Sequence, residues 1–400
     1  MADNYRISTL NMLTTSAELA ITEGLAYAKP YLYITPHNTF VIAKVDTRSF
    51  TIVATLDLSQ VSPTLTGMLG SFIAGNYLYV LPHLSNGATT FYQSDVVMVD
   101  LNNFTPAGCT TLAVLDASVA ISGLNGRTDG VNGYINVQST NFAVVTRFGL
   151  GKNFNAASIQ TVTLSSVAGF PVTKSNLVAV DQHNIYSVAM CITKQASGAG
   201  HNDRQTDLFL ITIPVNNFTA AAATFQRLTN VHFLRNNLPI AFDDGQNLWI
   251  PPIPIVAGPL TGKFVGVIKV PKANPAGVQV FQGPSSQPVP PTTTNCGMPV
   301  YDGSRYGYIT ADSAPQVVQI DTQNPGVVNL IDITAASAGY PMFGLGYDGH
   351  WAYTCSFNGA AGLCLKFLPT PTAGHGDGDD QGEDNDDQGG NDQGGQSGPG

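Results

Sequence analysis

The segment Tyr31–Ser59 contains three short β-rich runs separated by turn residues, and this unit recurs six more times along the chain. Tyr31–Thr35 and Thr39–Val45 are strand-length runs rich in β-branched and aromatic residues, and Thr51–Leu58 alternates between two sets of side chains. The pattern predicts antiparallel strands joined by tight turns.

The copies of the unit return at a steady interval. YLYITPH at 31–37 and YLYVLPH at 77–83 are close copies, and LWIPP, YGYIT and HWAYT follow at 248–252, 306–310 and 350–354. From Asp46 to Asp321, equivalent turn residues span 275 positions in five steps, or about 55 residues a repeat. A repeat of about this length that is built from strands predicts the blades of a propeller.

Each unit also contains a run of small apolar residues, often followed by an Asp-Gly pair, as at Asp244-Gly245, Asp302-Gly303 and Asp348-Gly349. Asp-Gly is a strong hairpin signal because a two-residue turn that matches strand twist needs positive φ. We therefore expect an all-β, seven-bladed β-propeller with these runs innermost. The third unit, 129–164, is the most degraded copy, so six or eight blades remain open.

The last unit, Gly339–Pro371, supplies three strands and no fourth. Tyr5–Leu13 reads as a strand and has no partner of its own. The economical prediction is that residues 1–15 complete the last blade and close the ring, which covers two strand edges; a frayed terminus is the alternative. The predicted propeller then spans residues 1–373.

The remaining residues, 374–400, form a Gly/Asp/Gln/Asn segment that holds eight of the 27 acidic residues and no Lys or Arg. Such a segment buries nothing, and it predicts a disordered acidic tail. The propeller itself carries 19 acidic against 17 basic residues. Neither part has the basic face of a nucleic-acid-binding protein.

Residues 1–15 lack the basic start and apolar centre of a signal peptide, and no run approaches the length of a membrane span. The expected location is therefore the cytoplasm or an assembly. The charged fraction is only 11%, which is more usual for particle-forming or extracellular proteins than for cytosolic enzymes.

Residues that carry chemistry are sparse. Common hydrolase, metalloprotease and phosphate-binding motifs are missing, and the five cysteines show no zinc-ligand spacing, so no cofactor and no metal are expected. His37 and His83 occupy the same place, just after the second strand, in neighbouring units. They could line one rim and bind a ligand there, although Pro-His is also ordinary turn sequence.

The first unit resembles the YVTN-type β-propeller repeat, in which an aromatic-Val-Thr-Asn element is followed by Val-Ile-Asp-Thr and Val-x-Thr-Ile elements. The residues concerned are Tyr33–Thr35, Val45–Thr47 and Val53–Leu56, and Ile320–Thr322 repeats the middle element; Pro36 stands where the family has Asn. Asp244–Ile250 is similar to the D-G-x-L-W motif of sensor and lactonase-like propellers. The resemblance implies the fold. It implies no particular function, because members of such families include both binding proteins and hydrolases.

The long connections, 83–94, 190–207, 251–262 and 283–296, are expected on one face of the disc, and binding residues concentrate on such loops. The most polar loop brings His201, Asp203 and Arg204 together.

Two functional hypotheses follow. The favoured one is a non-enzymatic binding or scaffold protein that presents this face to a protein or glycan, as part of a particle or surface assembly. The alternative is a lactonase- or esterase-type propeller hydrolase that acts at the channel mouth.

Overall fold

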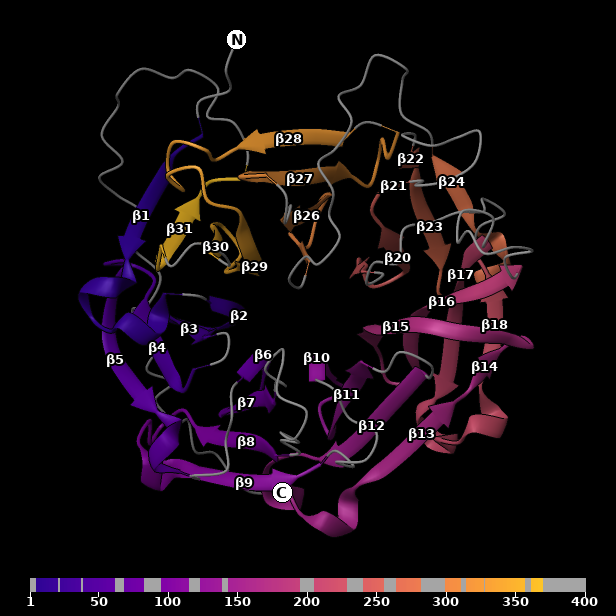
Figure 1. Ribbon diagram of the computed structural model, residues 1–400, viewed down its shortest axis with the longest axis horizontal. Coiled ribbons are helices and arrows are strands. Elements are labelled where there is room, and N and C mark those ends of the chain that lie inside the picture. Colours follow the sequence, from indigo (N-terminus) through magenta and orange to yellow (C-terminus); the bar gives the residue numbers. More distant parts are fainter. Residues whose placement is uncertain are drawn as a thin grey trace, which may run out of the picture.

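The computed structural model describes residues 5–20, 22–36, 39–61, 68–82, 95–114, 123–138, 143–194, 205–228, 240–254, 264–281, 299–310, 314–326, 328–356 and 361–369. Within these ranges, seven sheets of four or five antiparallel strands stand around a central axis (Figure 1). The expected all-β, seven-bladed propeller is confirmed. The helical segments of the described chain are single 3-10 turns, and none has the length and apolar character to span a membrane.

The blades are numbered 1 to 7 in chain order, and in each the first strand is nearest the axis. Their strands are, for blade 1, β2 (Thr22–Ala28), β3 (Tyr31–Pro36), β4 (Val41–Asp46) and β5 (Thr51–Asp57); for blade 2, β6 (Met68–Ala74), β7 (Tyr77–Pro82), β8 (Asp95–Asp100) and β9 (Cys109–Ala113); for blade 3, β10 (Gly123–Thr128), β11 (Asn132–Gln138), β12 (Ala143–Gly149) and β13 (Gln160–Leu164); for blade 4, β15 (Phe170–Val180), β16 (Asn184–Lys194), β17 (Gln205–Pro214) and β18 (Thr224–Arg227); for blade 5, β19 (Phe242–Asp243), β20 (Asn247–Ile250), β23 (Val267–Pro271) and β24 (Gln279–Phe281); for blade 6, β25 (Val300–Tyr301), β26 (Tyr306–Thr310), β27 (Gln316–Asp321) and β28 (Val328–Asp332); and for blade 7, β29 (Met342–Tyr347), β30 (Ala352–Ser356), β31 (Leu363–Phe367) and β1 (Ile7–Asn11).

Three further strands and nine short turns complete the described elements. Strand β14 (Ser166–Val167) pairs with the start of β15, and β21 (Ile253–Pro254) pairs with β22 (Phe264–Val265). The 3-10 turns are η1 (Met12–Thr14), η2 (Ala17–Leu19), η3 (Leu58–Gln60), η4 (Pro106–Gly108), η5 (Gly151–Asn153), η6 (Ala156–Ser158), η8 (Val215–Asn217), η9 (Ala220–Ala222) and η10 (Pro275–Gly277).

The N-terminal strand closes the ring. β1 pairs antiparallel with β31, in a register that runs from Ile7 opposite Phe367 to Asn11 opposite Leu363, and it forms the outer edge of blade 7. The turn that follows is anchored as well, because the side chain of Met12 is fully buried and its backbone N–H donates to the Gly362 carbonyl at 2.7 Å. The predicted latch is therefore confirmed.

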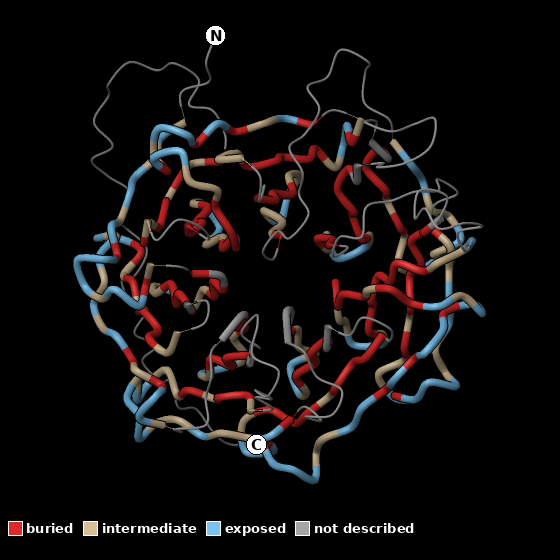
Figure 2. The backbone as a smooth tube through the Cα atoms, viewed as in Figure 1, coloured by how far each residue is buried: buried red, intermediate tan, exposed pale blue. Residues whose placement is uncertain are grey.

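The core lies between the blades and consists mainly of second-strand and third-strand side chains, whereas the outermost strands are exposed (Figure 2). One large aromatic residue from each second strand is almost completely buried in this core. These residues are Tyr33, Tyr79, Tyr134, Tyr186, Trp249, Tyr308 and Tyr353. In all but the last blade the ring is the third residue of its strand, so the repeated Tyr-x-Tyr or Asn-x-aromatic sequence places an equivalent ring in each blade.

The polar groups of several of these rings are satisfied by the turn between the first and second strands. Asp244 accepts hydrogen bonds from the backbone N–H groups of Gln246 and Asn247, at 2.8 and 2.6 Å, and from the indole Nε1–H of Trp249 at 2.6 Å. Asp129 and Asp348 accept from the hydroxyls of Tyr134 and Tyr353 in the same way, at 2.7 and 2.5 Å. The Asp of each of these turns therefore caps the turn and pairs with the buried aromatic residue five positions later.

Blade 3 differs from the expectation in one respect. The unit 129–164 identified from the sequence begins after the inner strand of its blade, which is β10 at Gly123–Thr128. This strand is irregular in its pairing and includes the polar residues Asn125, Arg127 and Thr128, so its sequence does not show the apolar run expected of an inner strand. Contacts with neighbouring blades stabilise it, which a local pattern does not reveal.

Antiparallel order fixes which connections share a face. The turns between first and second strands and between third and fourth strands emerge on one side of the disc, here called the short-turn face. All other connections, including those at 83–94 and 195–204, join strand ends on the opposite side, here called the long-loop face. This assignment agrees with the two faces expected from the sequence.

Candidate binding site in the central channel

The five residues proposed from the sequence, His37, His83, His201, Asp203 and Arg204, lie outside the described residues. The strands that flank them are defined: His37 follows β3, His83 follows β7, and the other three lie between β16 and β17. All of these strand ends are at the long-loop face. Their role in binding stays a prediction.

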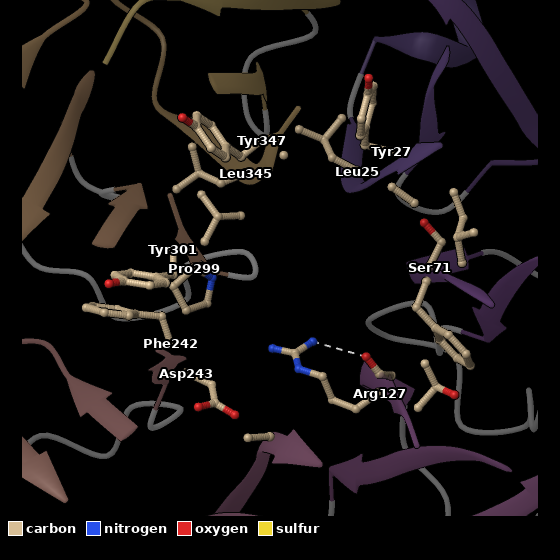
Figure 3. Close-up of a pocket in the computed structure, with 18 of the residues that line it drawn as sticks. Leu25, Tyr27, Ser71, Arg127, Phe242, Asp243, Pro299, Tyr301, Leu345 and Tyr347 are labelled. Carbon is tan, nitrogen blue, oxygen red and sulfur yellow. Dashed lines mark hydrogen bonds between the residues drawn. The ribbon is translucent and has the colours of Figure 1, made fainter. Parts of the chain in front are cut away.

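The described part of the channel contains an open cavity of about 490 Å³, and the innermost strands of all seven blades contribute to its wall (Figure 3). The lining residues come from the C-terminal ends of these strands, such as 25–27 of β2 and 345–347 of β29. The cavity therefore lies in the half of the channel nearer the short-turn face, opposite to the face that the sequence favoured.

Aromatic residues line the cavity, although the Phe242 ring is 2% exposed and packs into the core between blades 5 and 6. Phe242 and Tyr301, on β19 and β25, stack with centroids 5.9 Å apart and planes 6° apart. Tyr27 and Tyr347 line other parts of the cavity (Figure 3). Burial, as the largest cause, raises the pKa of Tyr27, Tyr301 and Tyr347, so their hydroxyls stay protonated at neutral pH.

Arg127 and Asp243 are the charged residues of this wall. The guanidinium of Arg127 points into the cavity, and its Nε and Nη1 donate to the carbonyl oxygens of Val178 and Gly126, at 3.3 and 3.0 Å. Loss of hydration lowers the pKa of Arg127 to about 10, whereas the nearby Asp243 carboxylate raises it by a smaller amount. The group is therefore still a cation at neutral pH.

Asp243 belongs to a small network of charges. Its carboxylate accepts a hydrogen bond from Lys272 Nζ at 2.9 Å and from the backbone N–H of Gly245 at 2.8 Å. Lys272 Nζ also lies 3.6 Å from a carboxylate oxygen of Asp181. The positive charges of Arg127 and Lys272 therefore balance the negative charges of Asp243 and Asp181 in this part of the channel.

Sequence reasoning missed the channel residues, although a local signal for some of them exists. The residue directly before the turn Asp lines the cavity in five blades: Thr128, Val180, Asp243, Tyr301 and Tyr347. Because the turn ends the inner strand, the preceding residue stands at the channel wall. Within the described ranges, no cluster of three or more His, Cys, Asp or Glu side chains could hold a metal ion.

Comparison with known proteins shows the fold alone. No family model matches the chain, and no curated protein matches it in sequence. The YVTN resemblance therefore stays a prediction.

Three solved structures are similar over most of their length. Hydrazine synthase of Kuenenia stuttgartiensis matches with a TM-score of 0.54 and 14% identity, over 87% of this chain and 95% of that one. Streptogramin B lyase matches with a TM-score of 0.55 and 12% identity, over 91% and 97%. The β-propeller domain of Cps50 (Swd1) from Myceliophteria thermophila matches with a TM-score of 0.53 and 8% identity, over 91% and 100%. The three matches therefore show the fold of this chain and no specific function.

Proposed function

We propose that this protein is a non-enzymatic binding or scaffold propeller that presents its long-loop face to a protein or glycan partner. Blade 4 is the element that contacts the partner in this proposal. The observation that carries the proposal is the length of its strands: β15 and β16 have 11 residues each and β17 has 10.

The extra length extends blade 4 at the long-loop face. At the short-turn face, β16 begins and β17 ends at the same relative position as the corresponding strands of blade 1, because Asn184 pairs with Pro214 just as Tyr31 pairs with Asp46. The second strands of the other blades have 4 to 7 residues. Four additional residues at ~3.3 Å each raise this hairpin by roughly 13 Å. The segment with His201, Asp203 and Arg204 connects its two strands.

The raised hairpin has a packed interior. Cys191 and Phe209 are 0% and 2% exposed, and the Phe209 ring lies 5.7 Å from the ring of Phe170 on β15. Asp207 is buried on β17 and forms an ion pair with Arg227 on β18. A rigid support of this kind lowers the entropy that a connecting loop loses on binding.

The low charged fraction, 11%, supports placement of this propeller in a particle or surface assembly, where neutral surfaces are buried against neighbours. The acidic residues at 377–392 then keep the free chain soluble. A cytoplasmic or assembly-associated location is part of the same proposal.

The test uses the full chain. A glycan array and affinity purification identify a binder, which is then titrated against the wild-type chain and against His201→Ala/Asp203→Ala/Arg204→Ala. We expect binding to weaken at least about tenfold with no change in melting temperature, because a connecting loop contributes few buried contacts.

The matched control places three alanines on the short-turn face, at Asn102, Asn103 and Thr105. Thr105 Oγ1 donates to Asn103 Oδ1 at 2.9 Å, so this variant is expected to lose stability and keep its affinity per folded molecule. A binder that tolerates the first variant and is lost with the second would refute the choice of face. Saturable turnover of p-nitrophenyl esters or lactones by the wild-type chain would instead favour the hydrolase alternative.

A further inference from the structure

Two buried cysteines face each other in blade 7. Cys355 on β30 is directly opposite Cys364 on β31 in the antiparallel register, and both are free thiols with 0% of their surface exposed. Opposite residues of a ladder point to the same face of the sheet. Both side chains therefore enter the core between blades 7 and 1, where they pack in one cluster.

The spacing of this pair suits a covalent bond. Directly opposite residues of antiparallel strands have Cα atoms about 4.5 or 5.5 Å apart, and disulfides span Cα separations of roughly 4.4–6.8 Å. Within the described ranges, the other cysteines have different neighbours: Cys109 donates to the carbonyl oxygen of Thr105 at 3.4 Å, and Cys191 is opposite Asp207. Strand pairing thus selects Cys355 and Cys364 as the two that can bond with little movement of the backbone.

The N-terminal latch, formed by β1, η1 and η2, covers the pair. Cys364 is also opposite Leu10 of β1, and the buried side chain of Met12 belongs to the same cluster as the two thiols. Gly362, two residues before Cys364, accepts from the backbone N–H of Met12 at 2.7 Å and donates to the Ala20 carbonyl oxygen at 3.0 Å. Local opening of the latch would therefore expose the thiols to solvent.

While the latch is closed, the pair is poorly reactive. Burial, as the largest cause, raises the pKa of the Cys364 thiol, and the adjacent Cys355 thiol adds to this effect. The thiolate is the form that attacks a disulfide, so a protonated thiol behind the latch reacts slowly.

We propose that Cys355 and Cys364 form a redox lock on the blade that closes the ring, and that they are oxidised to a disulfide when the latch opens. The bond joins β30 to β31, so it holds the strand on which β1 docks in place while β1 is detached. This inference goes beyond the proposed function, because it concerns closure of the ring and requires no partner at the long-loop face.

The oxidant is a small disulfide such as glutathione disulfide. One thiolate of the pair attacks a sulfur of glutathione disulfide, which forms a mixed disulfide and releases one glutathione thiolate. The second protein thiolate attacks the protein sulfur of the mixed disulfide, and the second glutathione leaves. Two protein thiols and one glutathione disulfide thus become one protein disulfide and two glutathione molecules, and the two thiol protons pass to the leaving sulfurs.

Equilibration of the full chain with glutathione buffers, from the reduced and from the oxidised side, tests the lock. Mass spectrometry after acid quenching and alkylation gives the fraction of chains in which Cys355 is bonded to Cys364. We expect the equilibrium constant for this oxidation to be at least about tenfold larger in the folded chain than in guanidinium, because a disulfide that fits the folded geometry is favoured there. A smaller ratio would overturn the proposal.

Two matched methionine variants test the role of the latch. Met12→Ala shortens a buried side chain of the latch, whereas Met190→Ala shortens a similarly buried one in blade 4. In native buffer we expect the pair to be oxidised at least about tenfold faster in Met12→Ala than in the wild type, and at the wild-type rate in Met190→Ala, because the first change weakens the closed latch. Should Met12→Ala fail to fold, Leu10→Ala takes its place. Equal rates in the latch variant and in Met190→Ala would show that the latch does not control oxidation and would overturn this part of the proposal.

Discussion

The pairing of a turn aspartate with a buried aromatic ring can be tested at Asp244. Its carboxylate accepts from two backbone N–H groups and from the Trp249 indole, and the Trp249 side chain is 1% exposed. Asp244→Ala leaves that indole N–H buried without its acceptor, which costs about 1–3 kcal/mol. The lost turn bonds, which water partly replaces, add about 1 kcal/mol. We therefore expect the free energy of unfolding to fall by about 3 kcal/mol.

Guanidinium unfolding monitored by fluorescence and circular dichroism gives this quantity, and a double-mutant cycle isolates the pair. Trp249→Phe removes the donor, so Asp244→Ala should cost less when combined with Trp249→Phe than in the wild type, by about 1–2 kcal/mol. Asp244→Asn keeps one acceptor oxygen and replaces the other by an amide NH2 group, which cannot accept, so it should still cost about 1–3 kcal/mol. Additive effects of the two substitutions, or a loss below about 0.5 kcal/mol for Asp244→Ala, would refute the reasoning.

The same pair predicts a dependence on pH. Burial raises the pKa of the Asp244 carboxyl most strongly, but the hydrogen bonds from Trp249 and Asn247 together outweigh it and lower the pKa in the folded state. A carboxyl with a lowered folded pKa stabilises the protein above its unfolded pKa of about 3.9 and loses that contribution as pH falls through the folded value. The stability difference between wild type and Asp244→Ala should thus be constant at neutral pH and shrink below about pH 4. A difference that persists unchanged into that range would contradict the assignment.

Three further outcomes are expected. Deletion of residues 1–13 should destabilise the whole propeller because blade 7 loses its outer strand, and a melting temperature within a degree or two of the full chain would argue against the latch. Removal of residues 374–400 should leave the melting temperature unchanged and raise the isoelectric point from about 4.9; loss of folding would contradict the disorder prediction. Gly307→Ala should destabilise by about 1–3 kcal/mol, because a Cβ there would lie 2.1 Å from the Phe242 ring, whereas Gly277→Ala, with no neighbour closer than 3.7 Å, is the matched control in denaturant unfolding.

Local sequence determined the fold class. A strand-built repeat of about 55 residues, the Asp-Gly turns and the Tyr-x-Tyr pattern of the second strands each have a short-range physical cause, namely strand period, positive φ and a buried ring at a constant place. The latch was predictable for a related reason, because a blade with three strands leaves an edge that a spare strand can cover.

Tertiary structure decided what the sequence left open. β10 forms although Gly123–Thr128 lacks the pattern of an inner strand, because strand pairing and the adjacent blades stabilise it. The cavity gathers Tyr27, Arg127, Asp243 and Tyr347 from blades far apart in sequence, and only closure of the ring brings them together. Local periodicity reports which face of a strand is buried, whereas the position of a residue along a shared axis depends on the register and tilt of all seven sheets.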